Sequence, residues 1–441
     1  MNPFLAGPQF RLVSSVRRIH DQGIPAEQVI DECLERIARL DSELHAWVGW
    51  DRNNSLTAAR ELDMRRKAGE APGVLWGIPL GIKDLFDVAG MPTGCGFGPW
   101  ETGEPSRDDG PLVQRLRRAG GVVLGKTVTT QFACFDPPPT RNPWNLGRTP
   151  GGSSSGSAVA VAAGMCLGAL GSQTGGSIIR PAAFCGIAGY KPSWGRFPVE
   201  GVFPAAPSLD VPGPMAGGVH DLWVLEGVLS EAGAPELRMR LEAEGTRPGR
   251  LGILGGRFAQ VAAADCAALF EQTLSRLSRA GLCVADCPLP ASFDTVLENH
   301  RTVMLTEIAA GHVERFRDLR PHYLPRMSAL IEEGSQRRGV DYVLARQHQR
   351  EFSQDMDRLF EEWDILACPA TPGGAPGPET TGDPTFNSPF SYCGLPAVTI
   401  PMGLDSDGLP LGLQLIGRRN GDRELLLVAL WCEAVLGPLA T

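Results

Sequence analysis

The sequence predicts an α/β fold: a large mixed, mostly parallel twisted β-sheet covered by helices on both faces. In the first half of the chain, short apolar segments bounded by glycines alternate with helical patterns. Strands joined by helical crossovers produce this alternation. The 441 residues exceed an average domain, but α/β sheets of this size often fold as one unit. We therefore expect a single domain over residues 1–441.

The N-terminal half supplies the first helices and strands. Pro25 suits a first helical turn, and apolar residues then recur at helical spacing as far as residue 40. The apolar pattern shortens from residue 75 onward and is punctuated by glycines, as expected for strands. The predicted helices are 25–40, 56–67, 112–118, 155–163 and 177–184, and the predicted strands are 75–82, 122–124 and 165–170.

The C-terminal half begins with a polar, charge-rich stretch at 231–250, which predicts a linker or an insertion. The segment 369–389 is rich in Gly, Pro and Thr and is expected to be a long loop. Loops of this length in compact domains tend to be functional or disordered. The remaining helices are expected at 264–280, 295–316, 342–363 and 424–436, and the strands at 251–254, 365–367, 397–400 and 411–416.

The charge and hydropathy patterns exclude several classes of partner. A formal net charge of −9 and a pI near 5.4 argue against nucleic acid or an anionic membrane, because phosphate groups bind basic surfaces. No segment reaches the roughly 18 apolar residues of a membrane span, and the N-terminus lacks a secretory pattern. We expect a cytoplasmic protein, with a homodimer as an open possibility.

The cysteines indicate neither a disulfide framework nor a metal site. Eleven cysteines are scattered along the chain, mostly in apolar surroundings, which is typical of reduced, buried thiols. Cys283 and Cys287 form a close pair, but four residues apart without nearby histidines is a poor zinc pattern. We expect no bound metal.

Residues 174–179 (TGGSII) place one serine after a glycine pair and just before a predicted helix. Acyl transfer requires a nucleophile, a base, and donors for the oxyanion. Ser177 can supply the attacking hydroxyl. The backbone N–H groups of Thr174, Gly175 and Gly176 can form an oxyanion hole, because glycines let them converge and the helix start adds a positive dipole end. The alternative is a strand-to-helix turn with Ser177 as N-cap.

A base for that serine is better supplied by lysine than by histidine. The seven histidines share no motif. Lys83 lies in the apolar run 81–85 (GIKDL), where burial would lower the pKa of its ammonium group; an ion pair with Asp84 or Asp87 is the alternative. The cluster 151–157 (GGSSSGS) lacks the Gly-Lys-Ser/Thr ending of a phosphate loop. It can be a flexible linker, but the Ala/Val-rich run after it favours a packed helix start.

Taken together, these stretches resemble the amidase signature family. The resemblance covers about 25–220 and 364–436 and implies the amidase signature fold. It implies an N-terminal helical segment at 1–70, a catalytic core at 75–220, a variable helical insertion at 231–363 and a C-terminal return of the core sheet at 364–436. The matching segments occur in order at the family's spacing: 77–84 (GIPLGIKD), 140–144 (TRNPW), 150–157 (PGGSSSGS), 175–177 (GGS), 185–192 (CGIAGYKP), 208–210 (SLD), 213–215 (GPM), 394–397 (GLPA) and 410–414 (PLGLQ).

The resemblance implies a Ser-cisSer-Lys triad formed by Ser177, Ser153 and Lys83. In this scheme Ser177 attacks the amide carbonyl, Ser153 relays its proton, and neutral Lys83 acts as the base and later returns the proton to the leaving amine. The peptide bond before Ser153 is cis in the family. The activity implied is hydrolysis of a small carboxylic amide to the acid and ammonia through an acyl-enzyme, without metal or cofactor.

Two positions depart from the commonest family pattern, Asp-Thr-Gly-Gly-Ser-Ile-Arg. Gln173 replaces the aspartate, and the arginine comes one residue later, at Arg180. An arginine beside an aspartate is neutralised, whereas Arg180 near a neutral Gln173 can hold a substrate carboxylate bidentately. The variation resembles that of malonamidase-type members; a structural ion pair elsewhere is the alternative. We expect Arg180, Gln173, Ser154 and Ser172 to contact the substrate.

Two other functions remain open from the sequence. The chain can be the amidase subunit of a tRNA-dependent amidotransferase, which would release ammonia from glutamine and pass it to a partner subunit; the variation at Gln173 and Arg180 argues against this. It can also be a catalytically silent amidase-fold binding protein. The intact Lys83, Ser153 and Ser177 argue against that second possibility.

Overall fold

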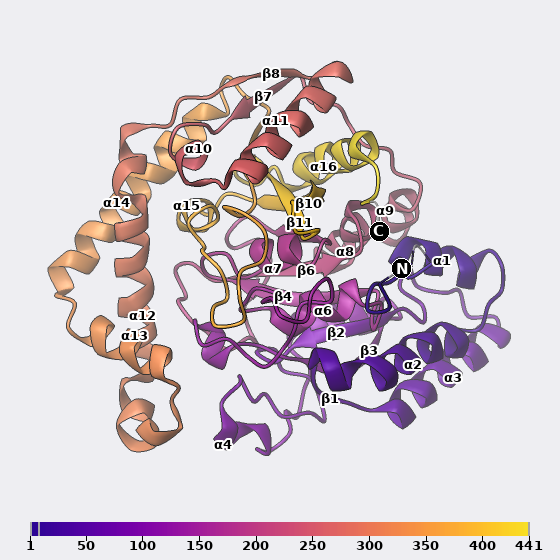
Figure 1. Cartoon of the computed structure of the whole chain (residues 1–441). Helices are drawn as coiled ribbons and strands as arrows, with labels where there is room; N and C mark the ends of the chain where they lie inside the picture. Colours follow the sequence, from indigo (N-terminus) through magenta and orange to yellow (C-terminus); the bar gives the residue numbers. More distant parts are fainter. Residues whose placement is uncertain (1, 8, 440–441) are drawn as a thin grey trace.

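The computed structural model describes residues 2–7 and 9–439, apart from the side chains of residues 257 and 259. One 11-stranded sheet has the order β1-β3-β2-β4-β6-β5-β10-β11-β9-β7-β8, from β1 near the bottom of Figure 1 to β8 near the top. The strands are β1 (Trp47–Trp50), β2 (Pro79–Lys83), β3 (Val122–Thr127), β4 (Gly168–Gln173), β5 (Ala188–Lys191), β6 (Val211–Ala216), β7 (Arg250–Ile253), β8 (Cys283–Asp286), β9 (Ile365–Pro369), β10 (Ala397–Leu404) and β11 (Pro410–Ile416).

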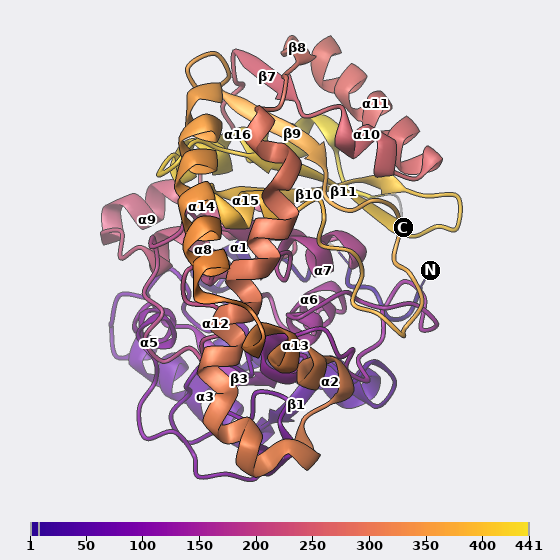
Figure 2. The ribbon, with the colours of Figure 1, turned by 90° about the vertical axis from the view of Figure 1, so that its left-hand side faces the viewer.

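Helices cover both faces of this sheet, which confirms the predicted α/β class. Figure 2 shows α6 and α7 on the right of the sheet and α5, α8 and α16 on the left. The helices are α1 (Leu12–His20), α2 (Ala26–Leu44), α3 (Arg52–Lys67), α4 (Gly98–Glu101), α5 (Pro111–Arg118), α6 (Ser155–Ala162), α7 (Ile179–Phe184), α8 (Val219–Leu229), α9 (Ala234–Arg240), α10 (Arg257–Val261), α11 (Ala264–Arg279), α12 (Val296–Leu319), α13 (Pro325–Ser335), α14 (Gly339–Leu359), α15 (Ser388–Tyr392) and α16 (Asp422–Leu436), with 3-10 turns η1 (Gln131–Ala133), η2 (Ala291–Thr295) and η3 (Arg320–His322).

The sheet is mixed, but the expectation that it is mostly parallel is wrong. Among the described residues, four strand pairings are parallel and six are antiparallel. Three of these six antiparallel pairings involve β5 or β6, which lie between β4 and β10. The sequence prediction missed both strands because they are short and contain Gly or Pro (AGYK and VPGPMA).

The segment 231–363 contributes more than helices. Its stretch 231–250, expected as a linker or insertion, contains α9, and β7 and β8 extend the same sheet beyond β9. The helices α12, α13 and α14 stand beside the sheet at the left of Figure 1 and in front of it in Figure 2. They therefore form a side wall next to the centre of the molecule.

The central parallel strands bring polar residues to one edge. Strands β2, β3 and β4 are buried along their whole length, and β2 pairs in parallel with both β3 and β4. Lys83 ends β2, and Ser172 and Gln173 end β4. Because the carboxyl ends of parallel strands meet at the same edge, these side chains come together there.

In the part of the chain that is described, no helix has both the length and the apolar character that a bilayer crossing requires.

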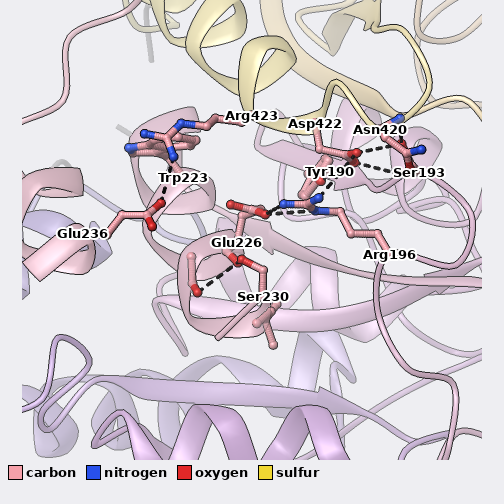
Figure 3. Close-up of polar contacts among 12 residues, drawn as sticks. Tyr190, Ser193, Arg196, Trp223, Glu226, Ser230, Glu236, Asn420, Asp422 and Arg423 are labelled. Carbon is pink, nitrogen blue, oxygen red and sulfur yellow. Dashed lines mark hydrogen bonds and ion pairs between the residues drawn. The ribbon is translucent and has the colours of Figure 1, made fainter. Parts of the chain in front are cut away.

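A buried polar network ties the C-terminal helix α16 to strand β5 (Figure 3). Asp422 accepts hydrogen bonds from Tyr190 Oη at 2.6 Å and from Ser193 N and Oγ at 2.8 and 2.7 Å. Arg196 approaches the same carboxylate at 3.9 Å and pairs with the buried Glu226. Asp422 and Tyr190 are 232 positions apart, so the network joins the two halves of the sequence.

Asp422→Ala should lower the free energy of unfolding by about 3 kcal/mol, because it leaves the hydroxyl of Tyr190 and the donors of Ser193 buried without an acceptor. The control is Asp407→Ala, which removes an ion pair with Arg148 at 3.0 Å whose carboxylate is 63% exposed; this change should cost less than about 1 kcal/mol. Urea unfolding followed by tryptophan fluorescence measures both. Equal losses would contradict the role assigned to Asp422.

Candidate active site

A pocket of about 250 Å³ opens where the carboxyl ends of β2 and β4 meet the first turns of α6 and α7. Its walls come mainly from the turn between β4 and α7, the segment at the end of η1, helix α12, and the long loop that follows β9. The lining residues are Ala133, Cys134, Phe135, Ser153, Thr174, Gly175, Gly176, Ser177, Arg180, Ala205, Leu297, His300, Arg301, Met304, Ile308, Thr381, Pro384, Thr385 and Ser388.

Lys83 lies fully buried beneath this pocket. Its Nζ is 2.8 Å from Ser153 Oγ, 2.9 Å from Ser172 Oγ and 3.4 Å from Ser172 O. Burial lowers the pKa of its ammonium group to about 7, although the nearby Asp210 opposes this shift. The ion pair with Asp84 considered from the sequence is not formed, since Asp84 pairs with Lys126 at 2.8 Å.

Ser153 lies between Lys83 and the pocket. It is 2% exposed, and the peptide bond between Gly152 and Ser153 is cis, as the family resemblance implies. Gly151 has φ +81°, and a side chain there would meet Pro181 Cα at 2.9 Å. A residue other than glycine therefore does not fit at position 151.

The turn from β4 into α7 presents Ser177 to the pocket. Ser177 is 8% exposed. Helix α7 begins at Ile179, two residues later than predicted, and Gln173 rather than Ser177 satisfies its start. Gln173 Oε1 accepts from Ile178 N at 2.8 Å and from Ile179 N at 3.0 Å. The N-cap role considered for Ser177 is therefore not found.

Several N–H groups of this turn are unused. Among the described residues, the backbone N–H groups of Gly175, Gly176 and Ser177 donate to no acceptor. They border the same pocket as the Ser177 side chain, so they can receive a negatively charged oxygen. Ser153 and Ser177 share the pocket, but the described residues include no hydrogen bond between their hydroxyls. A direct proton relay between them would require such a hydrogen bond to form.

Arg180 is a buried cation in the pocket wall. It is 2% exposed, and its Nη2 donates to Gly152 O at 2.7 Å and approaches Thr381 Oγ1 at 3.4 Å. Its Nε and Nη1 have no hydrogen-bonding partner in the described part of the chain. Burial lowers the pKa of the guanidinium to about 10, and Asp383 opposes the shift. The group therefore remains charged at neutral pH.

Three residues expected to contact the substrate lie behind the pocket rather than in its lining. Ser172 hydrogen-bonds Lys83, and Ser154 Oγ donates to Ser172 O at 3.3 Å. Gln173 faces the start of α7 and, through Nε2, donates to Ser391 Oγ at 3.0 Å. These positions indicate that the three side chains support the site rather than contact the substrate.

The structure adds residues that sequence motifs did not identify. His300, Met304 and Ile308 on α12 line the pocket, and nothing in their local sequence indicated a site. Asp210, which lay in a matching segment without an assigned role, accepts a hydrogen bond from Thr174 Oγ1 at 2.5 Å. The long loop after β9 had signalled function by its length, and Thr381, Pro384 and Thr385 of that loop line the pocket.

The described residues contain no group of three or more His, Cys, Asp or Glu side chains placed to hold a metal ion. The cysteines are unpaired, and all but Cys283 are buried. Cys134 borders the pocket, but burial raises the pKa of its thiol above the usual range. It is therefore a poor nucleophile, since the thiolate is the reactive form.

Comparison with known proteins identifies relatives along the whole chain. A family model described as Amidase matches residues 28–426. The chain is 34% identical to a glutamyl-tRNA(Gln) amidotransferase subunit of Symbiobacterium thermophilum, over 92% of each protein. It is 31% identical to 2-amino-5-chloromuconic acid deaminase of Comamonas testosteroni, over 97% of this chain and 96% of the relative.

Solved structures show the same architecture. The peptide amidase of Stenotrophomonas maltophilia matches with a TM-score of 0.83 at 29% identity, over 97% of each chain. A chain from a complex described in relation to the origins of an s-triazine catabolic enzyme matches with a TM-score of 0.89 at 28% identity, over 98% of this chain and 100% of the other. With the family model and these relatives spanning nearly its full length, the chain belongs to the amidase signature family and is an amide-hydrolysing enzyme.

Proposed function

We propose that this enzyme hydrolyses a small amide that also carries a carboxylate, releasing the acid and ammonia through an acyl-enzyme on Ser177. The observation that carries the proposal is the buried guanidinium of Arg180, which lines the same pocket as Ser177 and has two nitrogens without a partner among the described residues. A buried charge is costly unless it is paired. A carboxylate of the substrate would pair it.

Acylation uses Ser177, Ser153 and Lys83 in sequence. Ser177 Oγ attacks the amide carbon while its proton passes to Ser153 Oγ, and the proton of Ser153 passes to Lys83 Nζ at 2.8 Å. Nζ can accept it because burial brings the pKa of the lysine close to neutral. When the tetrahedral intermediate collapses, the C–N bond breaks and the proton returns by the same path to the leaving nitrogen, which departs as ammonia.

In deacylation water is the nucleophile and Ser177 is the leaving group. Water attacks the Ser177 ester, its proton passes toward Lys83, and the C–O bond to Ser177 breaks with the proton restored to that serine. In both steps the negative oxygen would lie against the free N–H groups of Gly175 and Gly176, with Thr174 held beside them by Asp210. Such donors typically lower the barrier by about 3 kcal/mol each.

The shape and charge of the pocket support a compact substrate with one anionic end. Leu297, Met304 and Ile308 give one wall an apolar surface, which suits the carbon skeleton. Among the described residues Asp383 forms no ion pair with Arg180, and its carboxylate accepts a hydrogen bond from Thr385 N at 2.8 Å. The guanidinium therefore lines the pocket without an ion-pair partner among the described residues.

The rate should depend on the protonation of Lys83. Because its pKa is lowered to about 7 and the neutral amine is the active form, kcat/KM should rise about tenfold per pH unit below pH 7 and level off above it. Lys83→Arg and Lys83→Ala should each remove this rise and lower kcat by at least about 10³-fold. The measurement is ammonia release between pH 5 and 9.

Asp210 also titrates near the site, since burial raises its pKa to about 6. The residual activity of Lys83→Ala distinguishes the two groups: a pH-dependent rise that persists in this variant belongs to Asp210. A flat wild-type profile would contradict the role of Lys83 as base.

Arg180→Ala should raise KM for the anion succinamate by about 10- to 100-fold while changing KM for neutral butyramide by less than threefold, because a charge-assisted hydrogen bond contributes about 1.5–3 kcal/mol. The neutral amide controls for any disturbance of Ser153 through the bond from Arg180 to Gly152 O. Arg301→Ala is a second control, since Arg301 lines the pocket but already pairs with Glu333. Equal effects on both amides would exclude the carboxylate role.

The likeness to an amidotransferase subunit favours a second candidate. In that case the physiological substrate would be glutamine, and the ammonia would pass to a partner subunit. Its prediction is specific: the isolated chain would have little amidase activity until amidotransferase partner subunits are added. Full turnover of succinamate by the purified chain alone, with no gain on adding those subunits, would reject it.

A further inference from the structure

Each carbonyl of the turn that carries Ser177 has its own donor. Thr174 O is 3.2 Å from His300 Nε2, Gly175 O accepts from Ser391 Oγ at 2.7 Å, and Gly176 O accepts from Arg180 N at 2.9 Å. The third bond belongs to the start of α7. The first two come from side chains on α12 and α15, and neither helix contains one of the sequence motifs that carry the family resemblance.

These hydrogen bonds also fix the direction of the N–H groups that belong to the same peptide units. In a planar trans peptide the C=O and the N–H point in opposite directions. A donor that holds Thr174 O therefore also aims the N–H of Gly175, and a donor that holds Gly175 O aims the N–H of Gly176. Neither N–H has an acceptor among the described residues, and both glycines line the pocket.

The chemistry of His300 suits this task. A carbonyl oxygen can only accept, so the imidazole must carry its proton on Nε2. The ring is 5% exposed, and burial lowers its pKa to about 4. His300 thus remains a neutral donor at neutral pH, and its bond to Thr174 O does not change over the range in which Lys83 titrates.

Ser391 is oriented in turn by Gln173. The side-chain amide donates from Nε2 to Ser391 Oγ at 3.0 Å, which leaves the hydroxyl proton for Gly175 O. Through Oε1 the same amide accepts from Ile178 N and Ile179 N. An ionised aspartate at position 173 could accept but could not donate. Glutamine at this position therefore links both sides of the turn.

We propose that His300 and Ser391 are positioning residues that aim the oxyanion-binding N–H groups of Gly175 and Gly176. This inference rests on the proposed function, because it assumes that Ser177 is the nucleophile. Neither residue needs to touch the substrate for the effect. Their loss should raise the barrier to the chemical step and leave substrate binding almost unchanged.

The first test compares His300→Phe with His312→Phe. His312 lies on the same helix, is also buried and also has a lowered pKa, but it contacts Tyr323 instead of the turn. His300→Phe should lower kcat for succinamate by about 10- to 100-fold, with KM within twofold of wild type. His312→Phe should keep kcat within threefold, and His300→Gln should recover most of the loss because its amide can donate to Thr174 O.

A second readout does not depend on choosing the right amide. A fluorophosphonate probe reacts at the serine with loss of fluoride and places its phosphoryl oxygen in the oxyanion hole. Its second-order labelling rate should fall by about tenfold in His300→Phe and also in Ser391→Ala, which releases a different carbonyl. Ser391→Ala decides the matter if His300→Phe does not fold.

Three results would overturn the inference. A rise in KM with unchanged kcat would make His300 a substrate contact. Equal losses in His300→Phe and His300→Gln, or in His300→Phe and His312→Phe, would make its role one of packing. An unchanged labelling rate in Ser391→Ala would exclude Ser391 as a residue that positions the N–H group of Gly176. Failure of the proposed function is distinguishable, because the wild-type enzyme would then neither hydrolyse succinamate nor react with the probe at Ser177.

Discussion

Burial of a lysine without a carboxylate partner is the constraint on which the rest of the site depends. Lys83 ends a fully buried strand, and among the described residues only serine oxygens lie within hydrogen-bonding distance of its Nζ. The neighbouring carboxylate of Asp84 is occupied by Lys126 from β3. If Asp84 turned toward Lys83, the attraction would hold the proton on the amine. In the proposed mechanism, the second lysine therefore keeps the first one available as a base.

The fold places this lysine by strand pairing and close packing. Parallel pairing of β2 with β4 brings Lys83 beside Ser172, and α6 brings Ser153 over both. That helix approaches closely because Gly156 has no side chain: a Cβ there would lie 2.2 Å from Ala46 O and 2.4 Å from Val128 N. The distance from Lys83 to Ser153 thus depends on contacts made by backbone atoms, which cannot rotate away.

Sequence reasoning succeeded where local pattern and structure coincide. The buried strands β2, β4, β9, β10 and β11 were predicted from short apolar runs. The motifs behind the family resemblance pointed to Lys83, Ser153 and Ser177, which lie together at or beneath one pocket, while their catalytic roles stay a prediction. The short strands β1, β5, β6 and β8 were missed because four to six residues with Gly, Pro or polar side chains have no clear period. His300 and Ser391 contact residues 126 and 216 positions away, and no local signal reports such partners.

The pocket joins two kinds of wall. The inner side is formed by Ser153, by the turn 174–177 and by Arg180 of α7, where the proposed reaction would take place. Helix α12 and the loop after β9 provide the surfaces that a substrate would meet. Under the proposed function, the α12 positions that line the pocket could then vary with the substrate. Position 300 could not do so freely, because its histidine also holds a carbonyl of the turn that carries Ser177. A graft of another helix at this place would have to preserve that donor before its new specificity could be expressed.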